Sequence, residues 1–430
     1  MKVKVIGAGL AGSEAAYYLA RRGVKVALYD IKPRSFTPAH KSAGFAELVC
    51  SNSLKSSDIF GNAAGLLKEE MRLLGSITME AAEYAKVPAG GALAVNREEF
   101  SAFITDKLKS HPNIEFVSEE ITEIPTDGFT IIATGPLTTE RLAAALKKVA
   151  GALSFYDASA PIIAADSIDM EHAFKGDRYG KGDGDHINCP MNKDEYRAFY
   201  DALISAERAE LHDFEKSEIF EGCMPVEVMA ARGKDTLRFG PLKPVGLDDP
   251  KTGKWAHATL QLRKENKAGT MYNMVGFQTN LKFGEQKRVF SMIPALSNAE
   301  FLRYGVMHRN TFINSPTALN PDYSFKEYPN VFIAGQLSGV EGYVESAGSG
   351  LLAAIYLERK LKGEKEILIS NETVLGALTK YITTPNKNFQ PMNANFGILP
   401  ALFAHDKKER KRLAAERSLF AVKEFLSEIN

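Results

Sequence analysis

The sequence predicts an α/β fold with a parallel sheet, and two stretches of the chain carry this prediction. Residues 2–6 (KVKVI) have the pattern of a buried strand, Ser13–Arg22 has the spacing of a helix that ends before Gly23, and residues 25–29 have the pattern of a second strand. The same alternation returns at residues 330–361, where a strand, a long glycine-bearing loop and a helix follow one another. Strands that alternate with helices are typical of doubly wound parallel sheets.

Three glycines stand between the first predicted strand and the first predicted helix. Gly7, Gly9 and Gly12 form the pattern G-x-G-x-x-G around Ala8, and Asp30 closes the second strand 18 residues beyond Gly12. Such glycines let the backbone turn tightly and approach a pyrophosphate, while a carboxylate after the second strand can accept hydrogen bonds from ribose hydroxyls. We therefore expect a Rossmann-type nucleotide site. The motif alone leaves open whether the nucleotide is NAD or FAD.

Later segments favour FAD. Thr134 and Gly135 follow another predicted strand, and Gly335 and Gln336 follow the next one, in the order of the second and third contact segments of glutathione-reductase-type FAD proteins. The helix after Gly342 can direct its N-terminal N–H groups at the flavin or the pyrophosphate. No second G-x-G-x-x-G for a resident nicotinamide nucleotide is visible.

The domain organisation follows from a change of character along the chain. A length of 430 residues predicts two domains. From about Asp166 to Asp322, many short apolar runs are broken by Gly and Pro. We expect residues 1–165 and 325–430 to form a discontinuous FAD-binding domain, and residues 166–324 to form an inserted α+β domain for substrate and RNA.

Composition limits the compartment and the partners. Lysine plus arginine equals aspartate plus glutamate at 53 each, so net charge neither supports nor excludes a nucleic acid. The apolar start of the chain resembles a signal peptide, but Glu14 interrupts it, and no long uncharged apolar run suggests a membrane span. Three cysteines, Cys50, Cys189 and Cys223, form no disulfide framework and lack zinc-site spacing. We expect a cytoplasmic protein without a bound metal.

The chain resembles the folate- and FAD-dependent tRNA uracil-5-methyltransferases (TrmFO), which are related to the GidA/MnmG flavoproteins. The resemblance spans nearly the full length. It includes the segments VIGAGLAGSEAA, TPAHKSAGFAELVCSNS, VPAGGALAVNREEFS, CMPVEVMAARG, YGVMHRNT, AGQLSGVEGYVESAGSG and FQPMNANFG. One local departure is Gly284 in LKFGEQKR, where relatives often carry proline, and this concerns the rigidity of a loop rather than the chemistry.

The resemblance implies C5-methylation of uridine-54 in the T-loop of tRNA, with methylenetetrahydrofolate as the one-carbon donor, FAD as the carrier and NADH or NADPH as the reductant. Uracil C5 is a poor nucleophile, so a thiolate must add at C6, and a general base must later remove the C5 proton. The family's pair of cysteines maps to Cys223 as nucleophile and Cys50 as base, although these roles could be reversed. Cys189 is interpreted as structural.

The same resemblance places His308 and Tyr343 near the folate and flavin, with Phe283 as a weaker candidate that we expect in the core. The thiols need nearby positive charge to ionise at neutral pH, and Lys55 and Arg232 are sequence neighbours that could supply it or could be ordinary surface charges.

For RNA, we expect contacts from Arg309, Lys282 and Arg288, whereas the cations of residues 407–417 are interpreted as a solvated helix face. Two alternatives remain open. One is a related flavoenzyme that methylates a ribosomal RNA uridine or modifies the wobble uridine of tRNA. The other is a non-catalytic flavin-bearing RNA-binding or sensor protein. The sequence does not indicate an oligomeric state.

Overall fold

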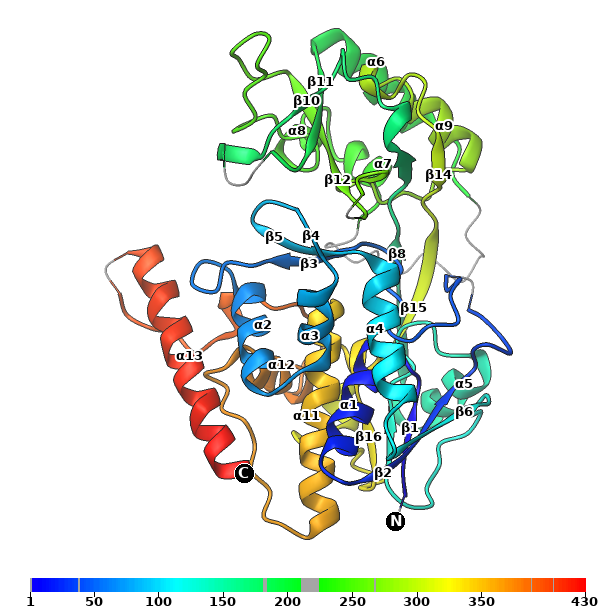
Figure 1. Ribbon diagram of the computed structural model, residues 1–430, viewed down its shortest axis with the longest axis vertical. Helices are drawn as coiled ribbons and strands as arrows, with labels where there is room; N and C mark the ends of the chain where they lie inside the picture. The colour runs from blue at the N-terminus through cyan, green and yellow to red at the C-terminus, as the bar shows by residue number, and fades with distance from the viewer. Residues whose placement is uncertain are drawn as a thin grey trace.

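The computed structural model describes residues 2–37, 39–180, 184–209, 224–266, 268–387, 389–404 and 406–430; for residues 152–157, 308 and 309 it describes the backbone alone. The chain forms two stacked units (Figure 1), with a parallel sheet in the lower one and an antiparallel sheet in the upper one.

The lower unit is built on a five-stranded sheet in the order β16-β7-β1-β2-β6. Its strands all pair in parallel, and β1 lies at its centre, with Val5 opposite both Leu28 of β2 and Ile131 of β7. The predicted α/β fold with a parallel sheet is confirmed. Its strands are β1 (Lys2–Ile6), β2 (Lys25–Asp30), β6 (Ile114–Ser118), β7 (Thr130–Ile132) and β16 (Val331–Ile333).

Helices cover both faces of this sheet. On one face, α1 (Leu10–Arg21) packs closely against α11 (Tyr343–Lys362), and a Cβ on Gly350 would stand 2.2 Å from the carbonyl oxygen of Ala11. On the other face, Leu142 and Leu146 of α5 (Glu140–Ala150) join a separate apolar cluster with residues of β7 and β16. The α1 helix begins three residues before the predicted Ser13, because Gly9 serves as its N-cap.

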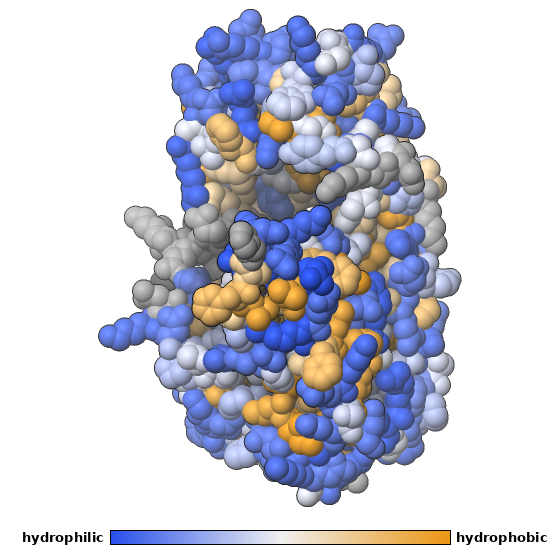
Figure 2. Space-filling model, turned by 90° about the vertical axis from the view of Figure 1, so that its left-hand side faces the viewer, coloured by the Kyte–Doolittle hydropathy of each residue, from blue (hydrophilic) through white to orange (hydrophobic). Residues whose placement is uncertain are grey.

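Most of the remaining elements of the lower unit pack outside α1 and α11. The long C-terminal helix α13 lies beside α2 at the left of Figure 1. Figure 2 faces that side and shows apolar side chains gathered over this part of the lower unit; Phe420 of α13 is 63% exposed. The same view shows a hollow between the two units. These elements are α2 (Ala63–Leu73), α3 (Ile77–Tyr84), α4 (Arg97–Lys109), α10 (Ser315–Ala318), α12 (Val374–Thr383), α13 (Lys407–Ile429) and the small sheet of β3 (Ser53–Ser56), β5 (Ala92–Val95) and β4 (Lys86–Val87).

The upper unit has a six-stranded antiparallel sheet in the order β10-β11-β12-β13-β9-β14 and a hydrophobic core of its own. Its elements are β9 (Ile162–Ala164), β10 (Phe174–Lys175), β11 (Ile187–Met191), β12 (Ala258–Lys264), β13 (Met271–Met274), β14 (Phe301–Arg303), α6 (Lys193–Ser205), α7 (Val226–Ala231), α8 (Thr236–Phe239) and α9 (Phe283–Phe290). The expectation that Phe283 belongs to the core is wrong. It is the first residue of α9 and is 54% exposed, because the helix buries Gln286, Val289 and Phe290 instead.

An antiparallel ribbon joins the two units. It consists of β8 (Ala152–Ala158) and β15 (Met307–Ile313), with Ala158 opposite Met307 at its upper end and Ala152 opposite Ile313 at its lower end. Among the described residues, no helix combines the length and apolarity that a membrane span requires.

Candidate functional site

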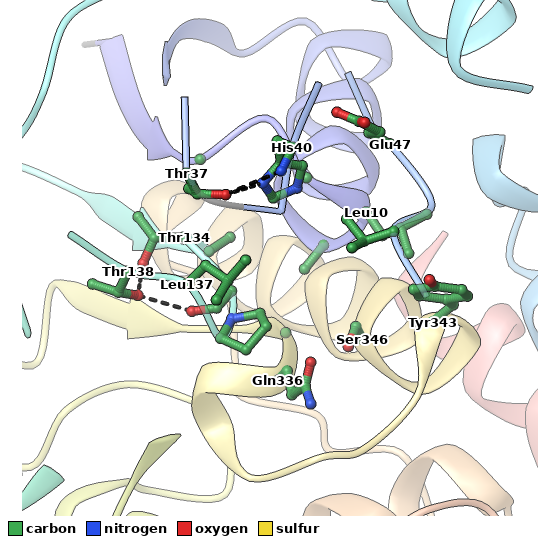
Figure 3. Close-up of a pocket in the computed structure, with 18 of the residues that line it drawn as sticks. Leu10, Thr37, His40, Glu47, Thr134, Leu137, Thr138, Gln336, Tyr343 and Ser346 are labelled. Carbon is green, nitrogen blue, oxygen red and sulfur yellow. Dashed lines mark hydrogen bonds between the residues drawn. The ribbon is translucent and has the colours of Figure 1, made fainter. Parts of the chain in front are cut away.

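A cavity of about 400 Å³ opens at the carboxyl ends of β1, β2, β7 and β16, where ligands of open α/β sheets are usually bound. The cavity brings together segments that lie far apart in the sequence (Figure 3). Its lining includes the predicted residues Gly7, Gly9, Asp30, Cys50, Thr134, Gly135, Gly335, Gln336, Gly342 and Tyr343, and on the side of the ribbon and the upper unit Ala158, Gln278 and Asn310.

Of the three glycines in the turn, only Gly9 has free space beside its Cα. Gly7 has φ +98°, and a Cβ there would stand 2.5 Å from the carbonyl oxygen of Ala133. A Cβ on Gly12 would stand 1.8 Å from the carbonyl oxygen of Gly7, so Gly12 sets the packing of helix on strand. A Cβ on Gly9 would meet no atom within 4 Å, and Gly9 lines the cavity. Ala8 and Gly12 do not line the cavity but lie behind it.

Asp30 holds this turn in shape. Its two carboxylate oxygens accept hydrogen bonds from the backbone N–H of Ala8 at 2.7 Å and of Lys32 at 2.9 Å. The N–H of Ala8 is therefore directed at Asp30 rather than at the cavity. Because each carboxylate oxygen has a second lone pair, Asp30 can still accept from a ligand hydroxyl.

The N-terminus of α11 faces the opposite side of the cavity. Gly342 is its N-cap with φ +120°, and a Cβ there would stand 2.2 Å from Oε2 of Glu345. Glu345 is buried; its Oε1 accepts from Lys55 Nζ at 2.7 Å and from the N–H of Ala394 at 3.1 Å, whereas Oε2 has no hydrogen-bond partner among the described residues. Lys55 thus forms an ion pair with a carboxylate of the cavity wall.

Cys50 and Tyr343 form a pair that sequence reasoning did not foresee. The Tyr343 oxygen accepts from the backbone N–H of Cys50 at 2.7 Å and of Ser51 at 3.3 Å, and it lies 2.9 Å from Cys50 Sγ. Since both lone pairs of the phenol are used by these N–H groups, its O–H is left to donate to the sulfur. Burial and the neighbouring Cys50 raise the pKa of Tyr343 well above its usual value, so the phenol keeps this proton.

Three arginines, Arg97, Arg263 and Arg303, lie close enough to the same thiol to interact with its charge, and the sequence did not place any of them there. Arg97 donates to the carbonyls of Leu48 and Val49 at 3.0 and 2.9 Å and pairs with the buried Glu265 at 2.8 Å. Arg263 donates to Ser51 Oγ at 2.8 Å. Burial lowers the pKa of Arg303, and the charge of Arg97 adds to this effect while that of Cys50 opposes it.

Nearby cations favour the thiolate form of a cysteine. Of the three arginines, only Arg97 falls in a segment that carries the family resemblance, VPAGGALAVNREEFS. Nothing in the local sequence of Arg263 or Arg303 marks them as neighbours of a thiol, because both belong to the upper unit and come close to Cys50 only when that unit packs on the lower one.

His40 also lines the cavity, where its Nδ1 lies 2.6 Å from Thr37 Oγ1 (Figure 3). Burial, together with the charge of Lys32, lowers the pKa of His40, so the imidazole is neutral at pH 7. Within the described part of the chain, no group of three His, Cys, Asp or Glu side chains is arranged as metal ligands.

The other two cysteines differ in their surroundings. Cys189 is fully buried in the core of the upper unit, and burial raises the pKa of its thiol strongly, as fits a structural residue. Cys223 lies outside the described residues. The described segments before and after this gap both bond to residues 278–280. The N–H of Ala209 donates to the carbonyl of Asn280 at 2.8 Å, and the N–H of Val226 donates to the carbonyl of Gln278 at 2.7 Å. Gln278 itself lines the cavity.

The remaining predicted residues lie on the ribbon and in the upper unit. The backbone of His308 and Arg309 belongs to β15. His308 is two positions before Asn310, and Arg309 is directly before it; the structure does not describe the side chains of these two residues. Lys282, the N-cap of α9, and Arg288 in α9 are exposed; they pair with Glu207 at 2.7 Å and Glu285 at 2.6 Å, respectively, and they do not line the cavity. Arg232 is exposed at the end of α7.

Comparison with known proteins identifies the family. The family profile described as "Glucose inhibited division protein A" matches residues 2–365. A protein of Acetivibrio thermocellus named methylenetetrahydrofolate--tRNA-(uracil-5-)-methyltransferase TrmFO is 57% identical over 430 residues, which cover 99% of this chain and 98% of that protein. A protein of the same name from Listeria monocytogenes is 58% identical over 432 residues, with 99% of both chains covered. The chain belongs to the TrmFO family.

The fold of this TrmFO-family chain is shared with a distant relative. The solved structure of GidA from Aquifex aeolicus matches it with a TM-score of 0.73 at 17% identity, and the match covers 100% of this chain and 73% of that one. Identity this low supports a common fold and nothing finer.

Proposed function

We propose that this chain transfers a one-carbon unit from methylenetetrahydrofolate to C5 of uridine-54 in the T-loop of tRNA, with FAD as the carrier and NADH or NADPH as the reductant. The names of the TrmFO relatives support the reaction and its tRNA substrate. The observation that carries the proposal is that one cavity is lined both by the glycine turn and by the Cys50–Tyr343 pair.

The lower unit is proposed to be a glutathione-reductase-like FAD-binding domain, with the upper unit as an inserted α+β domain and the limits 1–165, 166–324 and 325–430. Three features fit a dinucleotide. Gly9 leaves empty space at the N-terminus of α1, Asp30 retains accepting lone pairs, and α11 directs its N-terminus at the same cavity. Gly135, Gly335 and Gln336 complete the wall. When bound, FAD supplies the redox chemistry and carries the one-carbon unit.

The thiols are proposed to handle the pyrimidine ring. The Cys223 thiolate adds to C6, which places negative charge on the ring and makes C5 nucleophilic. After C5 has gained its carbon substituent, Cys50 Sγ accepts the C5 proton; the electrons of the C5–H bond re-form the C5–C6 double bond, and the C6–S bond breaks. The O–H of Tyr343 and the guanidinium groups of Arg97, Arg263 and Arg303 favour Cys50 as the thiolate that this step needs.

Other contacts extend the proposal. Tyr343 and His308 are proposed to bind the folate, and Arg309, Lys282 and Arg288 to bind phosphates of the RNA. The carboxylates of Glu207 and Glu285 now pair with Lys282 and Arg288, and a phosphate could replace them.

The decisive experiment incubates the FAD-loaded protein with an unmodified tRNA transcript, NADH or NADPH, and methylenetetrahydrofolate carrying labelled carbon, with S-adenosylmethionine absent. We expect label at C5 of uridine-54. Cys223→Ala and Cys50→Ala should abolish the transfer while FAD content is kept, and Cys189→Ala, in the core of the upper unit, is the matched control. Normal methylation by Cys223→Ala would refute its assignment as nucleophile.

The competing functions give different results in this assay. Label found only in ribosomal RNA, or at the wobble position, would replace the tRNA T-loop as the target. Oxidation of NADH or NADPH without any methylated product would indicate a flavin-bearing binding or sensor protein instead.

A further inference from the structure

Three aromatic rings form a parallel stack on the surface of the upper unit. The ring of Tyr304 lies between Phe283 and Phe301, with centroids 5.0 and 5.4 Å away and interplanar angles of 15° and 7°. These values describe offset stacking. Phe283, at one end of the stack, keeps 54% of its surface exposed, so a planar group can approach it from solvent.

Hydrogen bonds hold the stack at the upper end of the ribbon. The buried side chain of Gln286, one turn after Phe283 in α9, accepts from the N–H of Gly305 at 2.8 Å and donates to the carbonyl of Gly305 at 2.8 Å. Gly305 fits here because a Cβ would stand 2.5 Å from the carbonyl oxygen of Ser159. Both ends of the stack are thus fixed to the segment that enters β15.

This segment leads directly to the cavity. Strand β15 begins at Met307, and Asn310 in the same strand lines the cavity. Asn310 is six positions after Tyr304, a span of at most about 20 Å in an extended chain. The stack is therefore within about 20 Å of the cavity wall along this strand, on the side of the upper unit.

Cations lie close to the exposed ring. Lys282 precedes Phe283, Lys287 and Arg288 follow it on α9, and Arg208 forms a β-bridge with Leu281; all four are exposed. Among the described residues, the surface acidic groups close to these cations in the chain or by contact are Glu207, Glu285 and Glu300, so the four cations outnumber the three carboxylates. An exposed aromatic ring among lysines and arginines is the combination that binds single-stranded nucleic acid, since bases stack on the ring and phosphates meet the cations.

We propose that Phe283 is a stacking platform for one unpaired base of the RNA substrate, placed outside the cavity that receives the target uridine. The proposal rests on the proposed tRNA-methylating function and adds a second point of contact to it. Tyr304 and Phe301 back the platform ring, and Gln286 fixes its position relative to the ribbon.

The test measures binding of unmodified tRNA to FAD-loaded protein. Phe283→Ala should weaken binding by about 5-fold to 150-fold, the loss that follows from removing one base–aromatic stack. Phe283→Leu, which keeps apolar bulk without a planar ring, should weaken it similarly, whereas Phe283→Trp should bind at least as tightly as the parent. Phe420→Ala, an equally exposed phenylalanine on α13 in the other unit, is the matched control and should bind normally.

A second readout does not depend on affinity. Trp255 is the only tryptophan of the chain, so the double variant Trp255→Phe with Phe283→Trp reports from the platform alone. We expect its fluorescence to be quenched by tRNA and by an oligouridine at higher concentration. Normal binding by both Phe283→Ala and Phe283→Leu, or fluorescence unchanged by tRNA, would overturn the proposal. A change in particle mass in Phe283→Ala with unchanged RNA binding would also overturn it, because the ring would then be a contact between protein chains.

These outcomes are separable from the fate of the proposed function. Failure of the parent protein to methylate tRNA refutes the function itself. Methylation by the parent together with normal tRNA binding by Phe283→Ala refutes the platform alone.

Discussion

The hydrogen bond between Tyr343 and Cys50 makes the strongest prediction. Tyr343→Phe removes the phenol oxygen that now lies 2.9 Å from the sulfur and accepts from the N–H groups of Cys50 and Ser51. A hydrogen bond to a charged group contributes about 1.5–3 kcal/mol, and about 1.4 kcal/mol corresponds to one pH unit. The thiolate should therefore become harder to form by about 1 to 2 pH units. The loss of the acceptor for two N–H groups should also lower the free energy of unfolding by about 1–3 kcal/mol.

The assay follows alkylation of Cys50 by iodoacetamide as a function of pH, with the modified peptide quantified by mass spectrometry. In Tyr343→Phe, the pH of half-maximal rate should rise by about 1 to 2 units. Tyr356→Phe is the matched control: the Tyr356 hydroxyl is likewise buried and accepts a backbone N–H, from Ile369 at 3.1 Å, but it is not bonded to Cys50. A profile unchanged in Tyr343→Phe, or shifted equally in both variants, would refute the idea that the phenol stabilises the thiolate.

Three further predictions test the glycine turn and the buried charges. Gly9→Ala should weaken FAD binding at least about tenfold, because the added methyl group enters the open space of the cavity; the free energy of unfolding of the FAD-free protein should change by less than about 1 kcal/mol. Gly91→Ala, whose Cβ also meets open space, is the control and should retain FAD. Equal flavin content in the two variants would contradict the assignment of Gly9. Burial lowers the pKa of Lys68 to about 7, so between pH 7 and the unfolded-state pKa of 10.5 the folded chain binds fewer protons than the unfolded chain. The free energy of unfolding, measured in urea, should therefore rise with pH by up to about 1.4 kcal/mol per pH unit relative to that of Lys68→Met. Parallel plots of unfolding free energy against pH for the two proteins would refute the burial effect. Arg97→Ala and Glu265→Ala should each cost about 3–5 kcal/mol, since each leaves a buried charge unpaired, and the double variant should cost clearly less than the sum; additivity within about 0.5 kcal/mol in denaturant titrations would show that the pair is not coupled.

Local patterns were sufficient to predict much of the parallel sheet of the lower unit and the helices that follow its glycine turns. The strands at residues 2–6 and 25–29, and the helix and strand at 330–361, were recoverable because a buried parallel strand is apolar throughout and a glycine turn marks its end. The glycines that line the cavity follow from the same logic. The upper unit was foreseen only as a mixture of strands and loops, since short antiparallel strands pair with partners far away in sequence.

The site was predicted in part, for an identifiable reason. Cys50 and Tyr343 were each singled out, but not their contact, because 293 positions separate them and only the packing of α11 against the loop at Cys50 joins them. Arg263 and Arg303 come from a different unit. Phe283 was misplaced because a large aromatic side chain is usually buried, and nothing local reveals that a helix starts there with its first side chain exposed.

The ribbon of β8 and β15 has a consequence for how such a protein can be altered. At its upper end, Ala158 and Met307 are directly opposite each other, and opposed residues in an antiparallel pair are about 4.5–5.5 Å apart, a gap that a two-residue hairpin loop spans. Excision of residues 159–306 and closure with Asn-Gly would thus leave every strand of the lower sheet connected in its present order. Because the chain leaves and re-enters the lower unit at adjacent residues, one inserted domain can be exchanged for another at this point without any change in the strand order of the parallel sheet.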